Sequence, residues 1–345
     1  MFIKKNYWKK TILNFSSNIN DAIKNLNSSG LQITIIVDKK KNFIGTITDG
    51  DIRRGFLNGC KLSDKVAKII NKKFVSIKKG SSLKSAYKIM KSLNINYLPV
   101  LENKMLVNLY FYENSLFNNK IDNDFIIIAG GFGKRLYPIT KNIPKPMVRI
   151  KNKPILEHII INAKNEGFYK FTIIVHHLKD KIINYFKDGS KFGVNIEYIV
   201  EKKPLGTAGG LSLLKKKISK NIIITNADML SNLNFKDLLN YHKSNKSDAT
   251  VGVKVMSTKE NYGLVDLKGI NIVKFKEKPT LHRFINCGVY ALNTQSLKKL
   301  TMNKQIDMIT FLQNLKNDKK KIIAFPVYEG WLDLGNRKNL KKFLR

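Results

Sequence analysis

The sequence predicts an α/β protein in which a doubly wound, mostly parallel sheet over residues 124–345 follows a smaller α+β pair of modules over residues 1–118. Two patterns predict this organisation. After residue 124, short apolar runs alternate with segments of helical spacing, which is typical of repeated βαβ units. Before residue 118, a helix–strand–strand pattern occurs twice, with a period of a little over sixty residues. A length of 345 residues fits two domains of ordinary size.

The two modules at the N-terminus differ at the motif that ends each of them. The first ends with Gly45 to Arg53, G-T-I-T-D-G-D-I-R, which resembles the cystathionine-β-synthase-type (CBS) domain pair, a family whose modules often bind adenine nucleotides. The resemblance implies that the Thr48 hydroxyl and the Asp51 carboxylate contact the phosphates and the ribose. The second module has N-L-Y-F-Y-E-N from Asn108 onwards, without these groups. A purely structural or dimerising pair is the alternative.

A polar stretch between residues 116 and 124 predicts the linker that follows the modules. Beyond it, apolar runs bounded by turn residues predict buried strands, and one segment of helical spacing ends at Gly167, a suitable C-cap. The ligand of such a sheet is expected at the carboxyl ends of its strands. The expected elements are strands over 125–129, 171–175, 196–200, 222–225 and 249–255, and a helix over 154–165.

The first strand of the larger domain runs into a glycine-rich turn that carries basic residues. Glycines allow backbone N–H groups to approach phosphates closely, because no Cβ is in the way. Arg135 adds a fork of donors, and Lys145 is a second cation held between two prolines. The segment contains neither a G-x-x-x-x-G-K-[ST] nor a full G-x-G-x-x-G motif. The candidate phosphate-binding residues of the turn are Ala129, Gly130, Gly131, Gly133 and Lys134.

This turn and the motifs after it resemble the sugar-nucleotide pyrophosphorylases, or sugar-1-phosphate nucleotidyltransferases, over residues 125–345. The resemblance implies a Rossmann-like nucleotidyltransferase domain and a Mg²⁺ ion held by Asp228, in N-A-D, and Asp333, in W-L-D-L-G. It implies base recognition by the loop over residues 201–210. The nucleotide-binding residues implied in that loop are Gly206, Thr207 and Gly209, and the implied sugar-phosphate site consists of Gly263, Glu277, Lys278 and Asn286.

The family's chemistry explains why these residue types are needed. The phosphate oxygen of a sugar 1-phosphate attacks the α-phosphorus of a nucleoside triphosphate in line, and pyrophosphate leaves. Both reactants are polyanions, so catalysis is mostly positioning and charge neutralisation. By resemblance, Arg135 holds the leaving β- and γ-phosphates and Lys145 stabilises charge at the α-phosphate. Lys278 binds the phosphate of the sugar, and Glu277 accepts hydrogen bonds from its hydroxyls.

A CBS pair before a short nucleotidyltransferase domain resembles the guanylyltransferases that activate glucosamine 1-phosphate for legionaminic acid, a cell-surface glycan component. This implies GTP and either glucosamine 1-phosphate or mannose 1-phosphate, in a homo-oligomer. Thymidylyl or uridylyl transfer to glucose 1-phosphate is the alternative within the family. A glycosyltransferase usually has a D-x-D motif, whereas Asn226 stands at its first position here. A non-catalytic nucleotide sensor is a further alternative, although Arg135, Lys145, Asp228 and Lys278 are all present.

Composition bears on partners and compartment. The sequence has 63 lysine and arginine residues against 25 acidic ones, a formal charge of +38, but only seven of the basic residues are arginines. Because arginine clusters and stacking aromatics are missing, we expect a solvated lysine surface and no nucleic-acid partner. The cysteines, Cys60 and Cys287, form no CxxC pair, and no apolar run approaches the roughly 18 residues of a membrane span. We therefore expect a cytoplasmic protein without a membrane partner.

Overall fold

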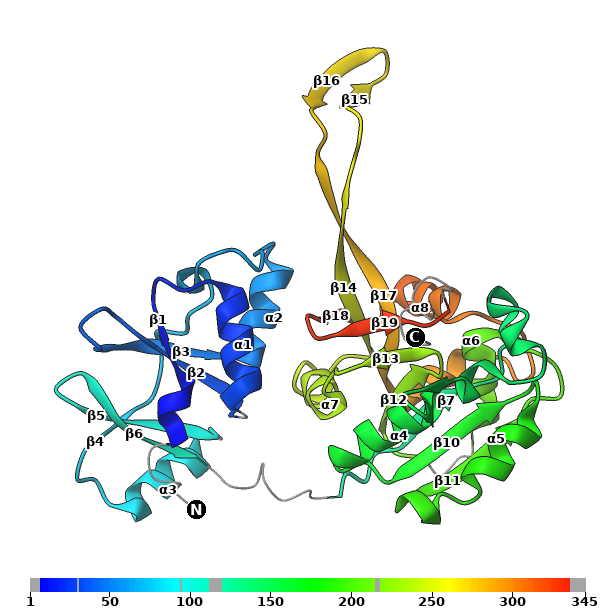
Figure 1. Cartoon of the computed structure of the whole chain (residues 1–345), viewed down its shortest axis with the longest axis horizontal. Helices are drawn as coiled ribbons and strands as arrows, with labels where there is room; N and C mark the ends of the chain where they lie inside the picture. The colour runs from blue at the N-terminus through cyan, green and yellow to red at the C-terminus, as the bar shows by residue number, and fades with distance from the viewer. Residues whose placement is uncertain (1–6, 30, 94, 112–119, 215–217, 336–345) are drawn as a thin grey trace. The chain divides into compact units, whose positions relative to one another are not determined.

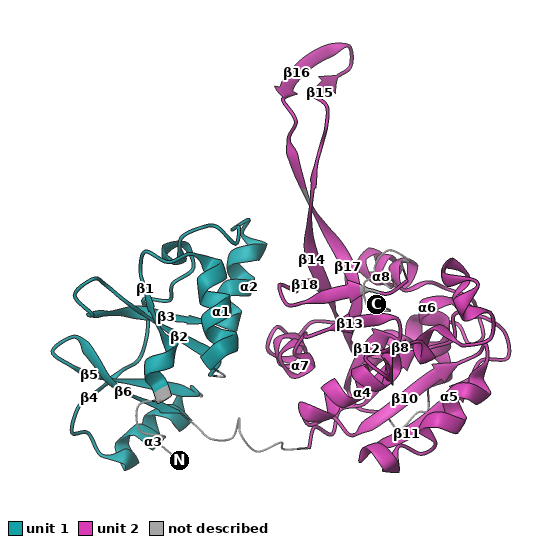
Figure 2. Ribbon diagram, viewed as in Figure 1, with its two compact units in different colours: residues 1–117 teal, residues 118–345 magenta. Residues whose placement is uncertain are grey.

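The structure, a computed structural model, describes residues 7–29, 31–93, 95–111, 120–214 and 218–335, without the side chains of Tyr7, His282 and Asp333. Two compact units, residues 1–117 and 118–345, divide the chain (Figures 1 and 2). Part of the predicted linker, residues 116–119, lies outside the described residues. Among the described helices, none is both long and apolar enough to cross a membrane.

The first unit contains two three-stranded sheets with the same topology. In each sheet the first strand runs parallel to the second, and the second is antiparallel to the third. The repeat expected from the sequence is therefore present. The first sheet and its helices consist of β1 (Ile12–Asn14), α1 (Ile19–Ser29), β2 (Ile33–Val37), β3 (Phe43–Thr48) and α2 (Asp49–Leu57). The second consists of β4 (Ile77–Lys78), α3 (Leu83–Ser92), β5 (Tyr97–Glu102) and β6 (Met105–Phe111).

The two sheets of this unit share one hydrophobic core. Ile33 and Ile35 of the first sheet pack in the same cluster as Leu106 and Leu109 of the second. The Tyr97 hydroxyl also accepts a hydrogen bond from the backbone N–H of Gln32. Because neither small sheet buries much surface alone, the pairing supplies the core that each lacks.

The second unit is built on a seven-stranded sheet of order β11-β10-β7-β12-β17-β14-β18. Of these strands, β17 alone runs antiparallel to its neighbours, so the expected mostly parallel sheet is confirmed. The strands are β7 (Phe125–Ile128), β10 (Lys170–Val175), β11 (Asn195–Val200), β12 (Asn221–Asn226), β14 (Ala249–Lys259), β17 (Thr280–Asn293) and β18 (Ile322–Pro326).

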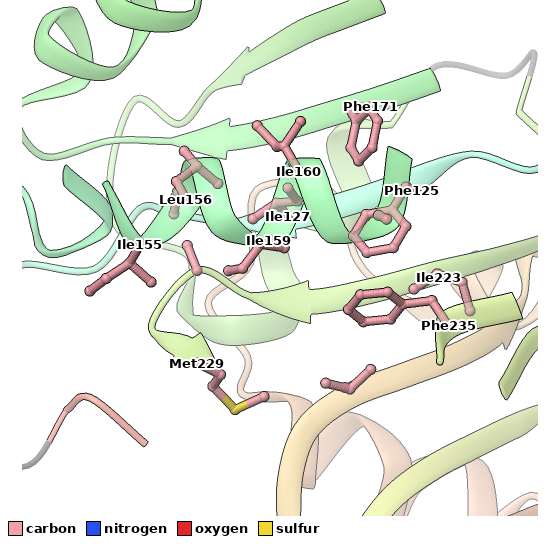
Figure 3. Close-up of a cluster of buried hydrophobic side chains, with 14 of the residues drawn as sticks. Phe125, Ile127, Ile155, Leu156, Ile159, Ile160, Phe171, Ile223, Met229 and Phe235 are labelled. Atoms are coloured by element: carbon pink, nitrogen blue, oxygen red, sulfur yellow. The ribbon is translucent and has the colours of Figure 1, made fainter. Parts of the chain in front are cut away.

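Helices cover both faces of this sheet, as a doubly wound fold requires. Helices α4 (Ile155–Asn165), α5 (Lys179–Phe186) and α7 (Phe235–Ser244) contribute to the larger core, where Phe125 and Phe171 contact each other (Figure 3). Helices α6 (Gly206–Gly209) and α8 (Met308–Asn317) contribute to a second core. The central strands β7, β10 and β12 are largely buried between these helices and therefore read as apolar runs.

A long two-stranded hairpin stands out from the sheet (Figure 1). The expected strand over 249–255 continues as β14 to Lys259 and pairs with β17 along its length, and β15 (Leu264–Lys268) and β16 (Asn271–Lys276) form the tip. A separate two-stranded ladder joins β13 (Met229–Ser231) to β19 (Trp331–Asp333). The hairpin was not expected from the sequence.

Candidate functional site

The carboxyl ends of β7 and β12 open into a cavity of about 350 Å³. The glycine-rich loop after β7 forms one wall, and the segment that follows β12 forms another. This is the position at which a doubly wound sheet binds its ligand. The predicted site residues that line the cavity are Ala129, Gly131, Gly133, Lys134, Arg135, Lys145, Thr207 and Asp228.

The glycine-rich loop presents backbone to the cavity. Gly133 has a φ of 67°, and the Thr140 hydroxyl closes the loop by donating to the Gly133 carbonyl at 2.8 Å. A Cβ built on Gly131 would meet no described heavy atom within 4 Å, so the space in front of this residue is open. The side chains of Lys134 and Arg135 are exposed beside it. Backbone amides and two cations thus border one small volume, which suits a polyphosphate.

Lys145 and Asp228 form an ion pair across the cavity. Lys145 Nζ lies 2.5 Å from Asp228 Oδ2, and the side chains are 14% and 33% exposed. Pro144 precedes the short turn Lys145–Met147 and restricts the backbone there. A half-buried cation and a carboxylate at one point allow a ligand to bind either charge.

The two predicted metal ligands lie on adjacent backbone segments. Asp228 ends the turn after β12, Met229 pairs with Asp333 in the β13–β19 ladder, and the Leu334 N–H donates to the Asp228 carbonyl at 3.1 Å. The Asp333 side chain is outside the described part of the structure. Asn226 lines the same cavity, and its buried Oδ1 atom has no hydrogen-bond partner among the described residues.

These donors fit a hard divalent cation. Mg²⁺ is usually held by one or two carboxylates together with substrate oxygens, and it keeps several waters. The Asp228 carboxylate and the orphaned Asn226 oxygen are both oxygen donors of this kind. No cluster of three or more His, Cys, Asp and Glu side chains occurs among the described residues, so an all-protein metal cage is not part of what the structure describes.

The predicted base-recognition loop is held by close packing. Gly206 has a φ of 76°, and a Cβ there would lie 2.6 Å from the Ile306 carbonyl oxygen. A Cβ on Gly209 would lie 2.5 Å from the carbonyl oxygen of Lys304. Thr207 lines the cavity, and its hydroxyl accepts from the Met308 N–H at 2.8 Å. The two glycines therefore position the loop, whereas Thr207 faces the ligand space.

Glu201 is the first residue of the predicted base-recognition loop, but the sequence analysis did not single it out as a nucleotide-binding residue. It is buried, and a Cβ on Gly130 would lie 2.7 Å from Glu201 Oε2, while one on Gly210 would lie 2.5 Å from Oε1. Burial raises the pKa of this carboxyl, and His176 and the Leu205 N–H act in the opposite direction. It directly follows β11 (Asn195–Val200), a strand at the edge of the sheet with a single buried residue, so nothing in the sequence indicated that this carboxylate is buried.

Comparisons with known proteins agree with this geometry. A family model described as nucleotidyl transferase matches residues 125–344, which is more than half of the chain. The chain belongs to the nucleotidyl transferase family. A CBS domain model matches residues 66–109, a range that covers most of the second module and excludes Thr48 and Asp51.

The nucleotidyl transferase domain also resembles individual proteins. It is 31% identical over 230 residues to mannose-1-phosphate guanylyltransferase 1 of Arabidopsis thaliana, covering 64% of this chain and 63% of that protein. It is 31% identical over 224 residues to mannose-1-phosphate guanyltransferase of Saccharomyces cerevisiae, covering 62% of each. The chain therefore spans less than two thirds of the length of these curated relatives. The crystal structure of HddC from Yersinia pseudotuberculosis has a TM-score of 0.52 and 25% identity, covering 64% of this chain and 97% of HddC.

The predicted sugar-phosphate residues lie in two separate places in the nucleotidyl transferase domain. Asn286 lies near the cavity, because its Oδ1 accepts from the Gly288 N–H and a Cβ on Gly288 would lie 2.7 Å from Asn226 Nδ2. Gly263, Glu277 and Lys278 lie on the projecting hairpin and do not line the cavity. The structure therefore does not bring this set together within one chain.

Thr48 and Asp51 in the first unit already have partners. The Asp51 Oδ2 atom accepts from both the N–H and the hydroxyl of Thr48, and Arg54 donates to Oδ1 at 2.6 Å. The two residues form a capping arrangement at the start of α2. This local structural role is sufficient to explain the motif, and a nucleotide would have to compete with it.

A second cavity in the nucleotidyl transferase domain is larger, about 580 Å³, and lies against β13, β19 and α4. Its lining is mostly apolar, with lysines and asparagines and no described carboxylate. Size alone would favour it, but the smaller cavity holds the glycine loop, the cations and Asp228. We therefore assign the phosphate chemistry to the smaller one.

Proposed function

We propose that this protein transfers a nucleoside monophosphate from a nucleoside triphosphate to a sugar 1-phosphate and releases pyrophosphate. The observation that carries the proposal is the cavity in which the glycine loop, Arg135, Lys145 and Asp228 meet. The loop amides and Arg135 bind the β- and γ-phosphates, which leave together. Lys145 moves from Asp228 to the α-phosphate and neutralises the charge that grows there during the in-line attack. The residues act by orientation and charge, and none of them forms a covalent bond to the substrate.

A divalent metal is typical of nucleotidyl transferases with this fold, and we propose Mg²⁺ as the ion. Asp228 and Asp333 would hold it, with Asn226 beside them. When bound, the ion supplies positive charge to the phosphate oxygens and a fixed template for them. The support from this structure is the backbone adjacency of the two aspartates and the orphaned Asn226 oxygen.

GTP is the proposed nucleotide. The similar proteins from Arabidopsis and yeast are named as guanylyl- or guanyltransferases. The buried Glu201 carboxylate next to Gly130 offers a reason in chemistry, because guanine has two adjacent donor groups, N1–H and N2–H, that a carboxylate can accept together. Uracil and thymine have a single N–H between two carbonyls. The alternative, uridylyl or thymidylyl transfer, leaves one Glu201 oxygen facing a carbonyl.

Mannose 1-phosphate and glucosamine 1-phosphate are the proposed sugars, for a cytoplasmic step that feeds a cell-surface glycan such as one containing legionaminic acid. We also propose a homo-oligomer and an adenine nucleotide at Thr48 and Asp51. Calorimetry of the full chain with AMP and ATP checks the last point, and no heat of binding would contradict it.

A substrate panel tests the function directly. The purified chain is incubated with Mg²⁺, each of four nucleoside triphosphates and several sugar 1-phosphates, and pyrophosphate is measured. We expect release only when both substrates are present, and fastest with GTP. Release without a sugar phosphate would indicate hydrolysis, and no release in any combination would reject the proposal.

Exchange of the buried carboxylate tests the base. In Glu201→Gln, one acceptor becomes a donor, so the side chain matches a carbonyl next to an N–H and no longer accepts from both donors of guanine. We expect kcat/KM for GTP to fall by roughly 10- to 100-fold, with relative gains for UTP and TTP. The control is Glu197→Gln, an exposed residue on β11, the strand that ends directly before Glu201. Equal losses with all four triphosphates would show that Glu201 supports the loop and does not select the base.

A further inference from the structure

The base-recognition loop is joined to the start of α8 by reciprocal hydrogen bonds. The N–H groups of Ala208 and Gly209 both donate to the Ile306 carbonyl, at 3.0 and 3.1 Å. The Ile306 N–H in turn donates to the Leu205 carbonyl at 2.9 Å. The loop and the segment over residues 304–308 are therefore held against each other through their backbones, although they lie far apart in the sequence.

Thr207 and Asp307, which are 100 residues apart, exchange helix caps. Asp307 occupies the N-cap position of α8, but its side chain makes no capping hydrogen bond to the described residues of that helix. The Thr207 hydroxyl caps α8 instead, because it accepts from the Met308 N–H at 2.8 Å. In return, Asp307 Oδ1 accepts from the Thr207 N–H at 3.3 Å, in the first turn of α6. Each residue thus satisfies a backbone donor at the start of the other's helix.

This arrangement decides which donor the loop offers to a ligand. The three consecutive N–H groups of Thr207, Ala208 and Gly209 already donate to protein acceptors. The Thr207 hydroxyl is different, because its oxygen lies 3.5 Å from Asp307 Oδ1, beyond the roughly 3.0 Å that is usual for an O–H···O bond. Thr207 lines the cavity. Its hydroxyl proton is therefore the group through which this part of the loop donates to a bound molecule.

The position of the Asp307 carboxylate depends on the glycine beside Thr207. Gly206 has a φ of 76°, and a Cβ there would lie 2.9 Å from Asp307 Oδ1. Only a residue without a side chain leaves room for the carboxylate at the start of α6. With its N–H held by Asp307 and its hydroxyl oxygen held by Met308, Thr207 is oriented before a ligand arrives. A donor that is oriented in advance costs little reorganisation on binding.

We propose that Asp307 is a positioning residue of the nucleotide site, which acts through Thr207 so that the Thr207 hydroxyl donates to an oxygen of the bound nucleoside triphosphate. Asp307 touches no substrate, since it is not among the described residues that line the cavity. The accepting oxygen belongs to the ribose or to a phosphate, so the bond strengthens binding without selecting the base. The inference rests on the proposed function for the identity of the ligand.

A double-mutant cycle on the full chain tests whether Asp307 acts through Thr207. Thr207→Val keeps the shape of the side chain and removes the hydroxyl, and we expect KM for GTP to rise by roughly 5- to 10-fold. Asp307→Ala should raise it by a similar factor, whereas Asp307→Asn keeps an acceptor and should restore most of the loss. The double variant should lose no more than Thr207→Val alone, because the two residues act as one unit. KM for the sugar phosphate should not change.

The matched control is Asn234→Ala, which removes the cap of another helix. Asn234 is the N-cap of α7, and its Oδ1 accepts from the Asp237 N–H at 2.9 Å. Like Asp307→Ala, this variant should lower the melting temperature, because an N-cap stabilises its helix. Unlike Asp307→Ala, it should leave KM for GTP unchanged. If both variants lower the melting temperature and neither changes KM, Asp307 has only a structural role and the proposal fails.

Calorimetry with GTP and with inosine triphosphate, which lacks the 2-amino group of guanine, separates this proposal from the proposed function. Thr207→Val should weaken the binding of both by the same factor, since the bond does not involve the base. A loss confined to GTP, or additive losses in the double variant, would overturn the proposal. If the wild type releases no pyrophosphate with any substrate, the proposed function fails, and calorimetry still decides. Equal affinities in the wild type, Thr207→Val and Asp307→Ala, or no binding by the wild type, would then reject the positioning role.

Discussion

The cavity and the projecting hairpin of residues 254–285, the arm, belong to one sheet, but they are built in opposite ways. Around the cavity, the strands that carry the site are buried on both faces, and close contacts at Gly206 and Gly133 fix the loops. On the arm, β14 and β17 leave the same sheet and run on with no buried side chain among those described. The first region packs its loops against other parts of the same unit, whereas the second carries apolar and polar side chains that no described residue of the unit covers.

The difference shows how a sheet distributes roles. Groups at the ends of parallel strands converge, because neighbouring strands end at the same edge. Side chains on a projecting hairpin lie away from that edge, at a distance set by the number of paired residues. The β14–β17 ladder shifts its register once, between Val251 and Val253, just before the hairpin leaves the sheet.

The largest effect is expected from Asp228→Asn, which removes a carboxylate from the cavity. Lys145 loses its partner and the metal loses an anionic ligand, so turnover should fall by on the order of 10³-fold or more, as when a preorganised electrostatic group is lost. The melting temperature should change little, because the side chain is partly exposed. Pyrophosphate release and a thermal scan measure the two quantities.

The matched control is Asp318→Asn. Asp318 forms an ion pair with Lys299 at 2.8 Å and does not line the cavity. This variant should keep wild-type turnover. If Asp228→Asn also keeps it, the cavity is not the catalytic region, and the contrast with the arm loses its meaning.

Much of the region around the cavity was predictable from the sequence. The buried strands, the helix over 155–165 and the turn after β7 follow from local apolar runs and glycines. The arm was not predictable in the same way. Beyond Val255 the chain reads M-S-T-K-E, which has no buried alternation, and its strand conformation depends on pairing with residues 280–284. Such non-local pairing overrides local preference.

Glu201 shows the same limit in the region around the cavity. Its carboxylate fits between Gly130, which is distant in sequence, and Gly210, because neither glycine has a side chain that would exclude it. A carboxylate after a strand is usually a solvated residue, so its type and position alone predicted nothing specific. The role proposed for Asp228 likewise rests on the other motifs that occur in order around it.

Three glycine-to-alanine variants compare the cavity with the arm, and we expect their effects to be of intermediate size. A methyl group on Gly131 meets no protein atom but enters the phosphate side of the cavity, so kcat/KM for the triphosphate should fall by roughly 10-fold or more without a loss of stability. On Gly206 it meets the Ile306 carbonyl at a positive φ, so the free energy of unfolding should fall by at least about 1–2 kcal/mol. On Gly269 of the arm φ is 62° and the space is open, so the free energy of unfolding should fall only by the cost of the left-handed backbone conformation.

Kinetics and urea denaturation separate these outcomes. Equal losses of stability for Gly131→Ala and Gly206→Ala would mean that the glycine-rich turn is a packing element and does not face a ligand. A loss of turnover in Gly269→Ala would mean that the turn at the tip of the hairpin contacts substrate, and not only Glu277 and Lys278.

The smallest expected effect at neutral pH, and the last, concerns the buried beginning of β14, the strand that later continues into the arm. His242, on α7, is buried with Nδ1 2.9 Å from Thr250 Oγ1 of β14 and Nε2 3.2 Å from Asn221 Oδ1 of β12. Burial lowers its pKa from the usual 6.5 to about 4. The folded state therefore favours the neutral ring, and its contribution to stability is present above pH 6.5 and is lost as the pH falls to about 4.

We expect the free energy of unfolding to decrease by on the order of 3 kcal/mol across that window and to show no further loss from this residue below it. His242→Gln should flatten the profile, because the amide keeps hydrogen-bonding groups and does not titrate. Urea denaturation at several pH values measures the slope. A His242→Gln profile as steep as that of the wild type would show that other groups, and not the buried imidazole, cause the loss of stability.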